Sequence, residues 1–379
     1  MRIAINLLPF RFELGGAGRF ARSLVHEFAR LDTVNEYTLF VTPFSASHFR
    51  TGAGRFSEVI CSVNPNNVLA RIAWEQFVLP IQLLRSHIDI LFTPSVSVPA
   101  FYTGRMYTAI LDIAYQRLPD KYPPWRRAYV AAATWVAVHR SDLLCTISEF
   151  SRSEIQSSFH IGEKRIVLTR CGLDEAFLTD PAPEQKQKVA ERYTLPAKFI
   201  LYVGAIEPGK NLDTLLRVFG QIVEDESRDE YLVLTGGLGW RKDHLEKNIS
   251  KRMFGRLKFL PFVPQEDLPA LYSLASCFAY LSSYEGFGLP VLEALACGVP
   301  VVASDLPPIR EFASGIALLV DPRDDKRIKE SILACLDAPD IKQFFRLKAP
   351  LAARRFTYEA AATALLEAFS DDTEDDIPR

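Results

Sequence analysis

The sequence predicts an α/β protein built from two doubly wound domains, each a parallel sheet covered by helices. A chain of 379 residues is longer than one hydrophobic core normally holds. Short apolar runs alternate with segments of helical spacing along the whole chain. These runs form two blocks, and the stretch between them, residues 172–188, is rich in proline, glycine and charge and has the composition of a linker. Two such domains are expected to face each other across a cleft.

The first block begins with an apolar run, a glycine-rich loop and a helix whose apolar residues recur at helical spacing from Phe20 to Leu31. A second helix is expected from about 71 to 85, and a third over 122–140. Ser148 carries a hydroxyl placed to cap the helix that starts there. The strands are expected at residues 2–8, 37–42, 56–60, 88–94, 107–113, 143–148 and 165–168.

The second block repeats this architecture without repeating its sequence. Its strands are expected at residues 199–204, 231–237, 257–262, 277–281, 299–303 and 316–320, and its helices at 212–223, 268–276, 290–295, 328–336 and 358–369. We therefore expect one Rossmann-like domain over 1–175 and a second over 176–355. A last helix and an acidic, disordered tail would complete the chain over 356–379.

Composition places the chain among globular proteins, with 48% hydrophobic and 24% charged residues. Its six cysteines are scattered and form no C-x-x-C pair, which argues against a zinc site or a disulfide framework and favours a reducing cytoplasm. No secretory signal or membrane-spanning stretch is expected, because the first apolar run meets Pro9 at once.

Charge is unevenly spread over a net of −2. Residues 1–175 contain 19 Lys and Arg against 15 Asp and Glu, a balance of +4, which leaves −6 for the remainder. This pattern excludes a nucleic-acid footprint. It leaves two interpretations open: ordinary surface scatter, or peripheral contact of the N-terminal half with the inner face of a membrane.

The stretch from Ser282 to Leu295 organises the second block. An apolar strand ends before it, a Gly-x-Gly loop follows, and Pro290 stands where a first helical turn tolerates proline. The free N–H groups of a helix N-terminus suit a phosphate. Glu285 and Glu293 flank the loop, and carboxylates accept hydrogen bonds from the hydroxyl pairs of sugars. The stretch therefore indicates a pocket for a nucleotide sugar.

These residues carry a resemblance to a known family. Glu285-Gly286-Phe287-Gly288-Leu289-Pro290 with Glu293 resembles the E-x7-E signature of retaining glycosyltransferases of family 4, which have the two-domain GT-B fold. The resemblance extends from Gly15 to about Asp321 and is stronger in the second block. It implies that the domain over 1–175 is the acceptor-side domain and that the domain over 176–355 binds the nucleotide sugar. It implies that Glu285 approaches the donor sugar, that Glu293 holds the ribose, and that the loop residues Gly286, Phe287, Gly288 and Leu289 line the donor site.

The resemblance assigns roles at other positions as well. The Gly15-Gly16 loop would approach the donor phosphates from the first domain, and Lys210, in a segment similar to the family's G-x-x-x-P-x-K-N, would hold them from the second. Gly204 and Gly236 end strands beside that loop, and the base would bind near Val263. Asp112 follows a strand, at the edge where open sheets place ligands. Lys210, Glu285 and Asp112 are the expected catalytic residues.

Two positions depart from the family pattern. Leu111 stands where many members have His before the Asp, and leucine can neither donate nor accept a proton. Relatives also place an Arg beside the Lys or after the preceding Gly, where this chain has Gly209 and Ala205. One of the two usual cationic contacts to the diphosphate is therefore missing.

Together these features predict a retaining, metal-independent hexosyltransferase that needs no cofactor beyond its nucleotide-sugar donor. The nearest-looking relatives act on glycan or lipid-linked acceptors in O-antigen or exopolysaccharide assembly, and several use GDP-mannose. Two alternatives remain: a catalytically silent module that binds nucleotide sugars, which Leu111 and the missing Arg favour, and a sugar-nucleotide epimerase. Intact Lys210, Glu285 and Glu293 favour the transferase.

Overall fold

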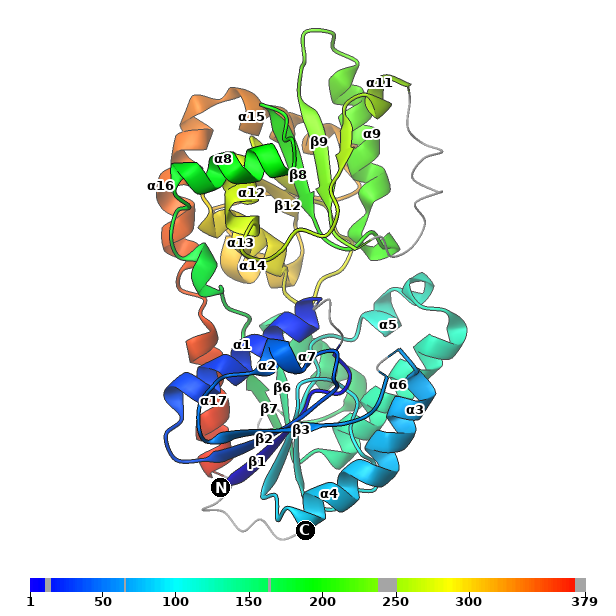
Figure 1. Cartoon of the computed structure of the whole chain (residues 1–379). Helices are drawn as coiled ribbons and strands as arrows, with labels where there is room; N and C mark the ends of the chain where they lie inside the picture. Colours follow the sequence, from blue (N-terminus) through cyan, green and yellow to red (C-terminus); the bar gives the residue numbers. More distant parts are fainter. Residues whose placement is uncertain (11–14, 65, 163–164, 238–250, 372–379) are drawn as a thin grey trace. The chain divides into compact units, whose positions relative to one another are not determined.

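The structure is a computed structural model that describes residues 1–10, 15–64, 66–162, 165–237 and 251–371. The chain divides into two compact units (Figure 1). Unit 1 contains Met1–Gly172 together with Thr357–Arg379, and unit 2 is Leu173–Phe356. The last helix therefore belongs to the first unit.

Unit 1 is built on a parallel sheet that has seven strands among the described residues, in the order β3-β2-β1-β4-β5-β6-β7. This order places β1 beside β4. Successive strands are therefore added on one side of β1 up to β3 and on its other side from β4 onward, with all strands parallel. The strands are β1 (Arg2–Asn6), β2 (Glu36–Val41), β3 (Phe56–Ile60), β4 (Ile90–Thr93), β5 (Arg105–Ala109), β6 (Leu143–Thr146) and β7 (Ile166–Leu168). Each lies within or close to its predicted range.

Helices connect these strands (Figure 1). They are α1 (Gly16–Leu31), α2 (Ala46–Phe49), α3 (Val68–Ala73), the π-helix η1 (Trp74–Val78), α4 (Leu79–Arg85), α5 (Ala114–Arg117), the 3-10 turn η2 (Pro119–Lys121), α6 (Pro124–Arg140), α7 (Glu149–Phe159) and α17 (Tyr358–Asp371). As predicted, Ser148 caps α7, and its hydroxyl accepts a hydrogen bond from the Ser151 N–H at 3.0 Å.

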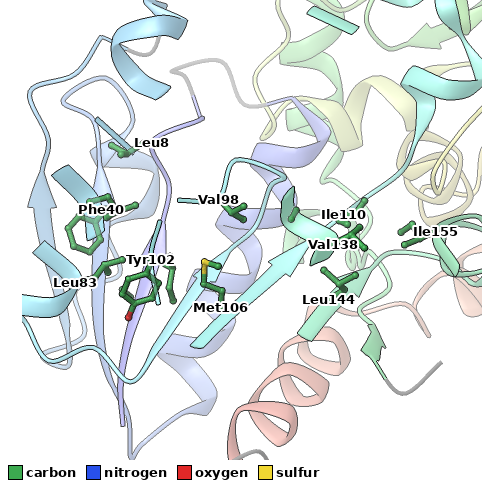
Figure 2. Packing of buried hydrophobic residues seen from close by; sticks show 14 of the residues in the cluster. Leu8, Phe40, Leu83, Val98, Tyr102, Met106, Ile110, Val138, Leu144 and Ile155 are labelled. Carbon is green, nitrogen blue, oxygen red and sulfur yellow. The ribbon is translucent and has the colours of Figure 1, made fainter. Parts of the chain in front are cut away.

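A hydrophobic cluster fills one side of this sheet (Figure 2). Leu8, Phe40, Val98, Met106 and Leu144 come from the strands and the loops after them, and all are buried. Leu83 of α4 and Val138 of α6 belong to the same cluster. Both helices therefore cover the same face of the sheet, because their buried sides share one core.

Unit 2 has a parallel sheet of six strands among the described residues, in the order β10-β9-β8-β11-β12-β13. They are β8 (Phe199–Val203), β9 (Tyr231–Thr235), β10 (Leu257–Phe259), β11 (Cys277–Tyr280), β12 (Val301–Ser304) and β13 (Leu318–Val320). The helices are α8 (Pro183–Arg192), α9 (Leu212–Val223), α11 (Lys251–Phe254), α12 (Leu268–Leu274), α13 (Leu289–Ala296), α14 (Pro307–Ala313), α15 (Asp325–Asp337) and α16 (Pro339–Ala353), with 3-10 turns η4 (Glu175–Phe177) and η5 (Pro208–Lys210). Both sheets confirm the predicted doubly wound α/β class.

The predicted linker at 172–188 is wrong in its second half, because α8 begins at Pro183. Proline is tolerated at the first helical position, and Glu184 in the first turn complements the helix dipole. The Gln-Lys-rich sequence that follows has good helix propensity. The helix docks on α12, since Tyr193 at its end donates a hydrogen bond to Asp267 at 2.8 Å. The acidic tail predicted to be disordered lies, from residue 372 on, outside the described residues. No described helix is long and apolar enough to cross a bilayer.

Candidate active site

The strand order of unit 2 marks one edge position of its sheet as the place for a ligand. β8 pairs with β11, and β9 and β10 continue the sheet on one side while β12 and β13 continue it on the other. In open α/β sheets, ligands bind at the carboxyl ends of the strands where the order reverses in this way. The loop after β8 carries Lys210, and the loop after β11 carries Glu285. The two predicted catalytic residues of unit 2 thus converge at the switch point.

Lys210 and Glu285 form an ion pair there. The Lys210 Nζ lies 2.7 Å from Glu285 Oε1 and donates a second hydrogen bond to the Tyr280 hydroxyl at 2.9 Å. Only 16% of the lysine side chain and 11% of the glutamate side chain are exposed. An ammonium group has three N–H bonds, so one remains for a ligand after these two contacts with described residues.

Burial and charge act in opposite directions on this group. Burial lowers the pKa of Lys210, but the negative charge of Glu285 outweighs burial and holds that pKa well above its ordinary value. Burial likewise raises the pKa of Glu285, whereas the Lys210 charge and hydrogen bond bring it below its ordinary value. Burial, followed by the Glu285 charge, raises the pKa of Tyr280. All three groups keep one protonation state near neutral pH: a cation, an anion and a neutral phenol.

The backbone around Lys210 is fixed by neighbouring loops. The Gly209 carbonyl accepts hydrogen bonds from the Ser283 N–H at 2.9 Å and from the Ser283 hydroxyl at 3.2 Å, which ties the loop after β8 to the loop after β11. Asn211 follows at a φ of 53°, a left-handed conformation that asparagine tolerates better than most residues. Its amide donates to the Pro322 carbonyl at 3.2 Å. Lys210 is therefore presented by a backbone with little freedom.

Gly204 and Gly236 end β8 and β9 and lie against each other. A Cβ atom built on Gly236, whose φ is 141°, would stand 2.1 Å from the Gly204 carbonyl oxygen. Both the conformation and the close approach require glycine at this position. Because both residues are glycines, the loops after β8 and β9 can pass this close to each other. The donor-binding role of both glycines stays a prediction.

The Gly-x-Gly loop leads into α13 as expected. Gly288 precedes the helix at a φ of 107°, and a Cβ there would lie 3.0 Å from Ile309 of α14. Pro290 occupies the first turn. The Phe287 ring is buried and stacks on Phe312 with ring centroids 5.0 Å apart. The Phe287 side chain thus anchors the loop to α14. The backbone of Gly286 and Phe287 lies just before the N-terminus of α13. Leu289, the first residue of α13, is buried.

Glu293 lies on α13 and is buried, with 1% of its surface exposed. Tyr272 of α12 donates a hydrogen bond from its hydroxyl to Glu293 Oε2 at 3.0 Å. The second acid of the motif is therefore held inside the unit by a tyrosine. Its predicted ribose contact stays a prediction. Val263, expected near the base, is a buried residue of the loop after β10.

The remaining predicted site residues belong to unit 1. Gly15 is the N-cap of α1 and Gly16 its first residue, so the free N–H groups of a 16-residue helix start at this loop. Residues 11–14 of the same loop lie outside the described residues. The Asp112 carboxylate accepts a hydrogen bond at 2.9 Å from the N–H of Ala114, the first residue of the short helix α5. Leu111, in place of the family's histidine, is partly buried beside it.

Sequence reasoning missed the tyrosines of this site. Tyr280 and Tyr202 lie on the paired strands β11 and β8, and their rings stack with centroids 6.0 Å apart beneath Lys210. In the sequence both stand inside apolar runs, where a buried parallel strand gives no sign of which side chain reaches the carboxyl end. No group of three or more His, Cys, Asp or Glu side chains that could hold a metal occurs in the part of the chain that is described.

Two doubly wound α/β units with these strand orders define the fold class of the chain, the two-domain GT-B fold. Solved structures agree. The chain aligns over 98% of its length with all of the Anabaena protein HepE, crystallised with UDP and glucose, at a TM-score of 0.76 and 16% identity. It aligns over 99% with 99% of sucrose-phosphate synthase from Thermosynechococcus elongatus, at a TM-score of 0.77 and 19% identity.

Sequence comparison gives the family. Residues 184–352 match the family described as glycosyl transferases group 1. Over 97% of its length the chain is 30% identical to the O-antigen chain mannosyltransferase B of Escherichia coli, covering 99% of that protein. The chain belongs to the group 1 glycosyltransferases.

Proposed function

We propose that this protein is a retaining, metal-independent hexosyltransferase that uses a nucleotide-sugar donor, with mannose from GDP-mannose as the first candidate. The acceptor would be a glycan or a lipid-linked glycan. The observation that carries the proposal is the Lys210–Glu285 pair at the switch point of unit 2. The similarity to the O-antigen chain mannosyltransferase B of Escherichia coli supports a mannosyl donor.

The proposed chemistry follows from the charges at that edge. Breaking the bond between the sugar and the diphosphate leaves negative charge on the phosphate oxygens and positive charge on the sugar ring. Lys210 keeps its charge because of Glu285, and it offers a preorganised cation to the departing diphosphate. The backbone N–H groups at the N-terminus of α13 carry partial positive charge and would also favour the diphosphate.

Glu285 would orient the donor sugar through its hydroxyls while remaining ionised beside Lys210. We assign no carboxylate nucleophile in unit 2, since Glu285 is engaged by Lys210 and Glu293 by Tyr272. Front-face attack, in which a donor phosphate oxygen accepts the proton of the acceptor hydroxyl, fits this arrangement and retains the anomeric configuration.

A donor screen tests the proposal. The protein is incubated with GDP-mannose and with UDP-, ADP- and dTDP-sugars, together with short mannose-containing oligosaccharides on a lipid-like aglycone. NMR of the product reports the anomeric configuration, and a parallel reaction in EDTA reports any dependence on metal. Retained configuration with undiminished turnover in EDTA supports the proposal in full. Donor binding without transfer or hydrolysis would favour the silent binding module, and a new free sugar nucleotide would favour the epimerase.

The basic balance of residues 1–175 supports one further component of the proposed function, peripheral contact of unit 1 with a membrane that carries the acceptor.

A further inference from the structure

The helical segment Val68–Arg85 of unit 1 exposes an apolar face. Positions 69, 73, 77, 81 and 84 follow helical spacing, and at these positions stand Leu69, Ala73, Phe77, Ile81 and Leu84. Leu69 is 80% exposed, Phe77 65% and Leu84 60%. A helix on the surface of a globular domain normally turns polar residues outward. Of the exposed residues in this segment, all are apolar except Arg85 at its end.

The loop after β4 extends the same face. Phe101 is exposed, and its ring stacks on that of Phe77 with centroids 6.0 Å apart. Gln76 of the π-helix fixes this loop with two hydrogen bonds: its side chain donates to the Val98 carbonyl at 2.8 Å and accepts from the Ala100 N–H at 2.7 Å. The exposed Phe77–Phe101 pair is therefore held by the fold.

Helix α6 covers the same side of the sheet, since its buried residues join the cluster that contains Leu79 and Leu83 of α4 (Figure 1). Trp125 and Trp135 are both exposed on it. Arg140 at its end donates to the Tyr102 carbonyl at 2.8 Å, next to Phe101. Tryptophan side chains are enriched at the interface between a membrane and water.

The exposed charged side chains on the segments that carry these residues are arginines, and the acidic residues Asp89, Asp120 and Asp142 flank the segments. Within residues 66–88, 99–105 and 122–140, Glu75 is the one acidic residue, and it is buried in an ion pair with Arg71 at 2.9 Å. The remaining charged side chains of these ranges are all arginines, at positions 85, 105, 126, 127 and 140. A patch of exposed apolar and aromatic side chains with cationic neighbours is typical of a surface that lies in the headgroup region of an anionic bilayer.

We propose that this docking face, formed by Leu69, Phe77, Ile81, Leu84, Phe101, Trp125 and Trp135, seats unit 1 on an anionic membrane. A second copy of the chain fits the face less well. A symmetric pair would bring the arginines of these segments toward those of its partner, with acidic residues only at the flanking positions Asp89, Asp120 and Asp142. The inference makes the proposed membrane contact specific, but its test does not depend on which sugar is transferred.

Vesicle co-sedimentation of the full chain tests it. The wild type is expected to bind vesicles of phosphatidylcholine with phosphatidylglycerol, to bind pure phosphatidylcholine vesicles much less, and to be released at high salt. Phe77→Ser with Ile81→Ser should weaken binding by about tenfold or more, because two large side chains no longer enter the interface. Arg126→Glu with Arg127→Glu should weaken binding and reduce its dependence on anionic lipid.

The matched control is a second exposed apolar group, on α16 of unit 2. Phe344 and Leu347 are exposed there, but exposed Lys342, Arg346 and Lys348 interrupt them. Phe344→Ser with Leu347→Ser should leave vesicle binding unchanged. Circular dichroism and nucleotide affinity should match the wild type in every variant. Loss of binding in the α16 pair alone, or wild-type binding in the Phe77/Ile81 pair, overturns the proposal. So does a concentration-dependent dimer in sedimentation velocity that the Phe77/Ile81 pair abolishes.

Discussion

Lys210 Nζ and Glu285 Oε1 lie 2.7 Å apart across two loops that are separated by 75 residues in the chain. The pair forms because β8 and β11 are neighbours in the sheet, so their following loops meet at one edge. The missing arginine beside Lys210 leaves this lysine as the cation that the loop after β8 offers at the switch point.

Lys210→Ala should reduce kcat by about 10²–10³, the usual effect of removing one preorganised donor to transition-state charge. Donor affinity should change less, because charge on the diphosphate grows as the glycosidic bond breaks. Lys210→Arg should recover part of the rate, limited by the different reach of a planar guanidinium. Steady-state kinetics with an identified donor measures this, with Lys198→Ala, an exposed lysine of the same unit, as the control. Wild-type turnover in Lys210→Ala would show that the diphosphate lies elsewhere.

Tyr280→Phe tests whether the hydroxyl 2.9 Å from Lys210 positions the ammonium. The ring and its stack on Tyr202 remain, so the fold should persist, while kcat should fall by about tenfold, as for one lost hydrogen bond to a charged group. The double variant with Lys210→Ala should be no slower than Lys210→Ala alone, since the hydroxyl would act only through the lysine.

Tyr193→Phe is the matched control for Tyr280→Phe. It removes a buried tyrosine hydroxyl that also contacts a charged group, Asp267, which is the N-cap residue of α12. It should lower stability and leave kcat unchanged. Additive losses of kcat in the Tyr280→Phe, Lys210→Ala double variant would show that the Tyr280 hydroxyl acts independently of Lys210.

Glu285→Gln should lower the free energy of unfolding by roughly 1.5–3 kcal/mol at neutral pH, because a buried charged hydrogen bond is lost. The folded pKa of Glu285 lies below its unfolded value, so its contribution is present above about pH 4.3 and is lost as pH falls through the folded pKa. The folded pKa of Lys210 lies above its unfolded value, so its contribution is full below about pH 10.4 and is lost as pH rises through the folded pKa.

Urea unfolding of wild type and Glu285→Gln across a pH series measures this window. The stability difference between the two proteins should be constant near neutral pH and should shrink in acid. A difference that stays the same down to pH values well below 4 would mean that the pair adds no charge-dependent stability.

Glu293→Gln separates a ligand role from a structural one. If Glu293 binds the ribose, the change should weaken donor binding by about tenfold, the value of one charged hydrogen bond. Tyr272→Phe removes the hydroxyl that holds Glu293 Oε2 and should lower stability with a smaller effect on donor affinity. Isothermal titration with the nucleoside diphosphate compares them. Equal losses of affinity in both variants would make Glu293 a structural residue of the α12–α13 contact.

The sequence carried most of the architecture because its signals were local. Buried parallel strands appear as short apolar runs, and the Gly-x-Gly loop with Pro290 marks the start of α13. Contacts between residues far apart in the sequence could not be predicted. No local pattern shows that Tyr280 contacts Lys210 or that Tyr272 contacts Glu293. Pro183 was misleading, because proline is common both in linkers and in the first turn of a helix. The hydrogen bond from Tyr193 to Asp267, which docks α8 on α12, stabilises the helix.

The last helix shows the same limit and gives the last prediction. Helix α17 follows unit 2 in the chain but packs on α1 in unit 1, where Phe369 is fully buried with ring centroids 5.9 Å from Phe28 and 5.4 Å from Tyr107. Phe369→Ala should cost about 3–5 kcal/mol of the stability of unit 1, by lost burial and a cavity.

Trp74, Trp125 and Trp135 all lie in unit 1, so tryptophan fluorescence during urea unfolding reports chiefly on it. Glu367→Ala, exposed on the same helix, should leave the midpoint unchanged. Nucleoside diphosphate binding should largely survive in native buffer, because Lys210 and the N-terminus of α13 lie in unit 2. A wild-type fluorescence midpoint in Phe369→Ala would show that α17 contributes little to the first unit.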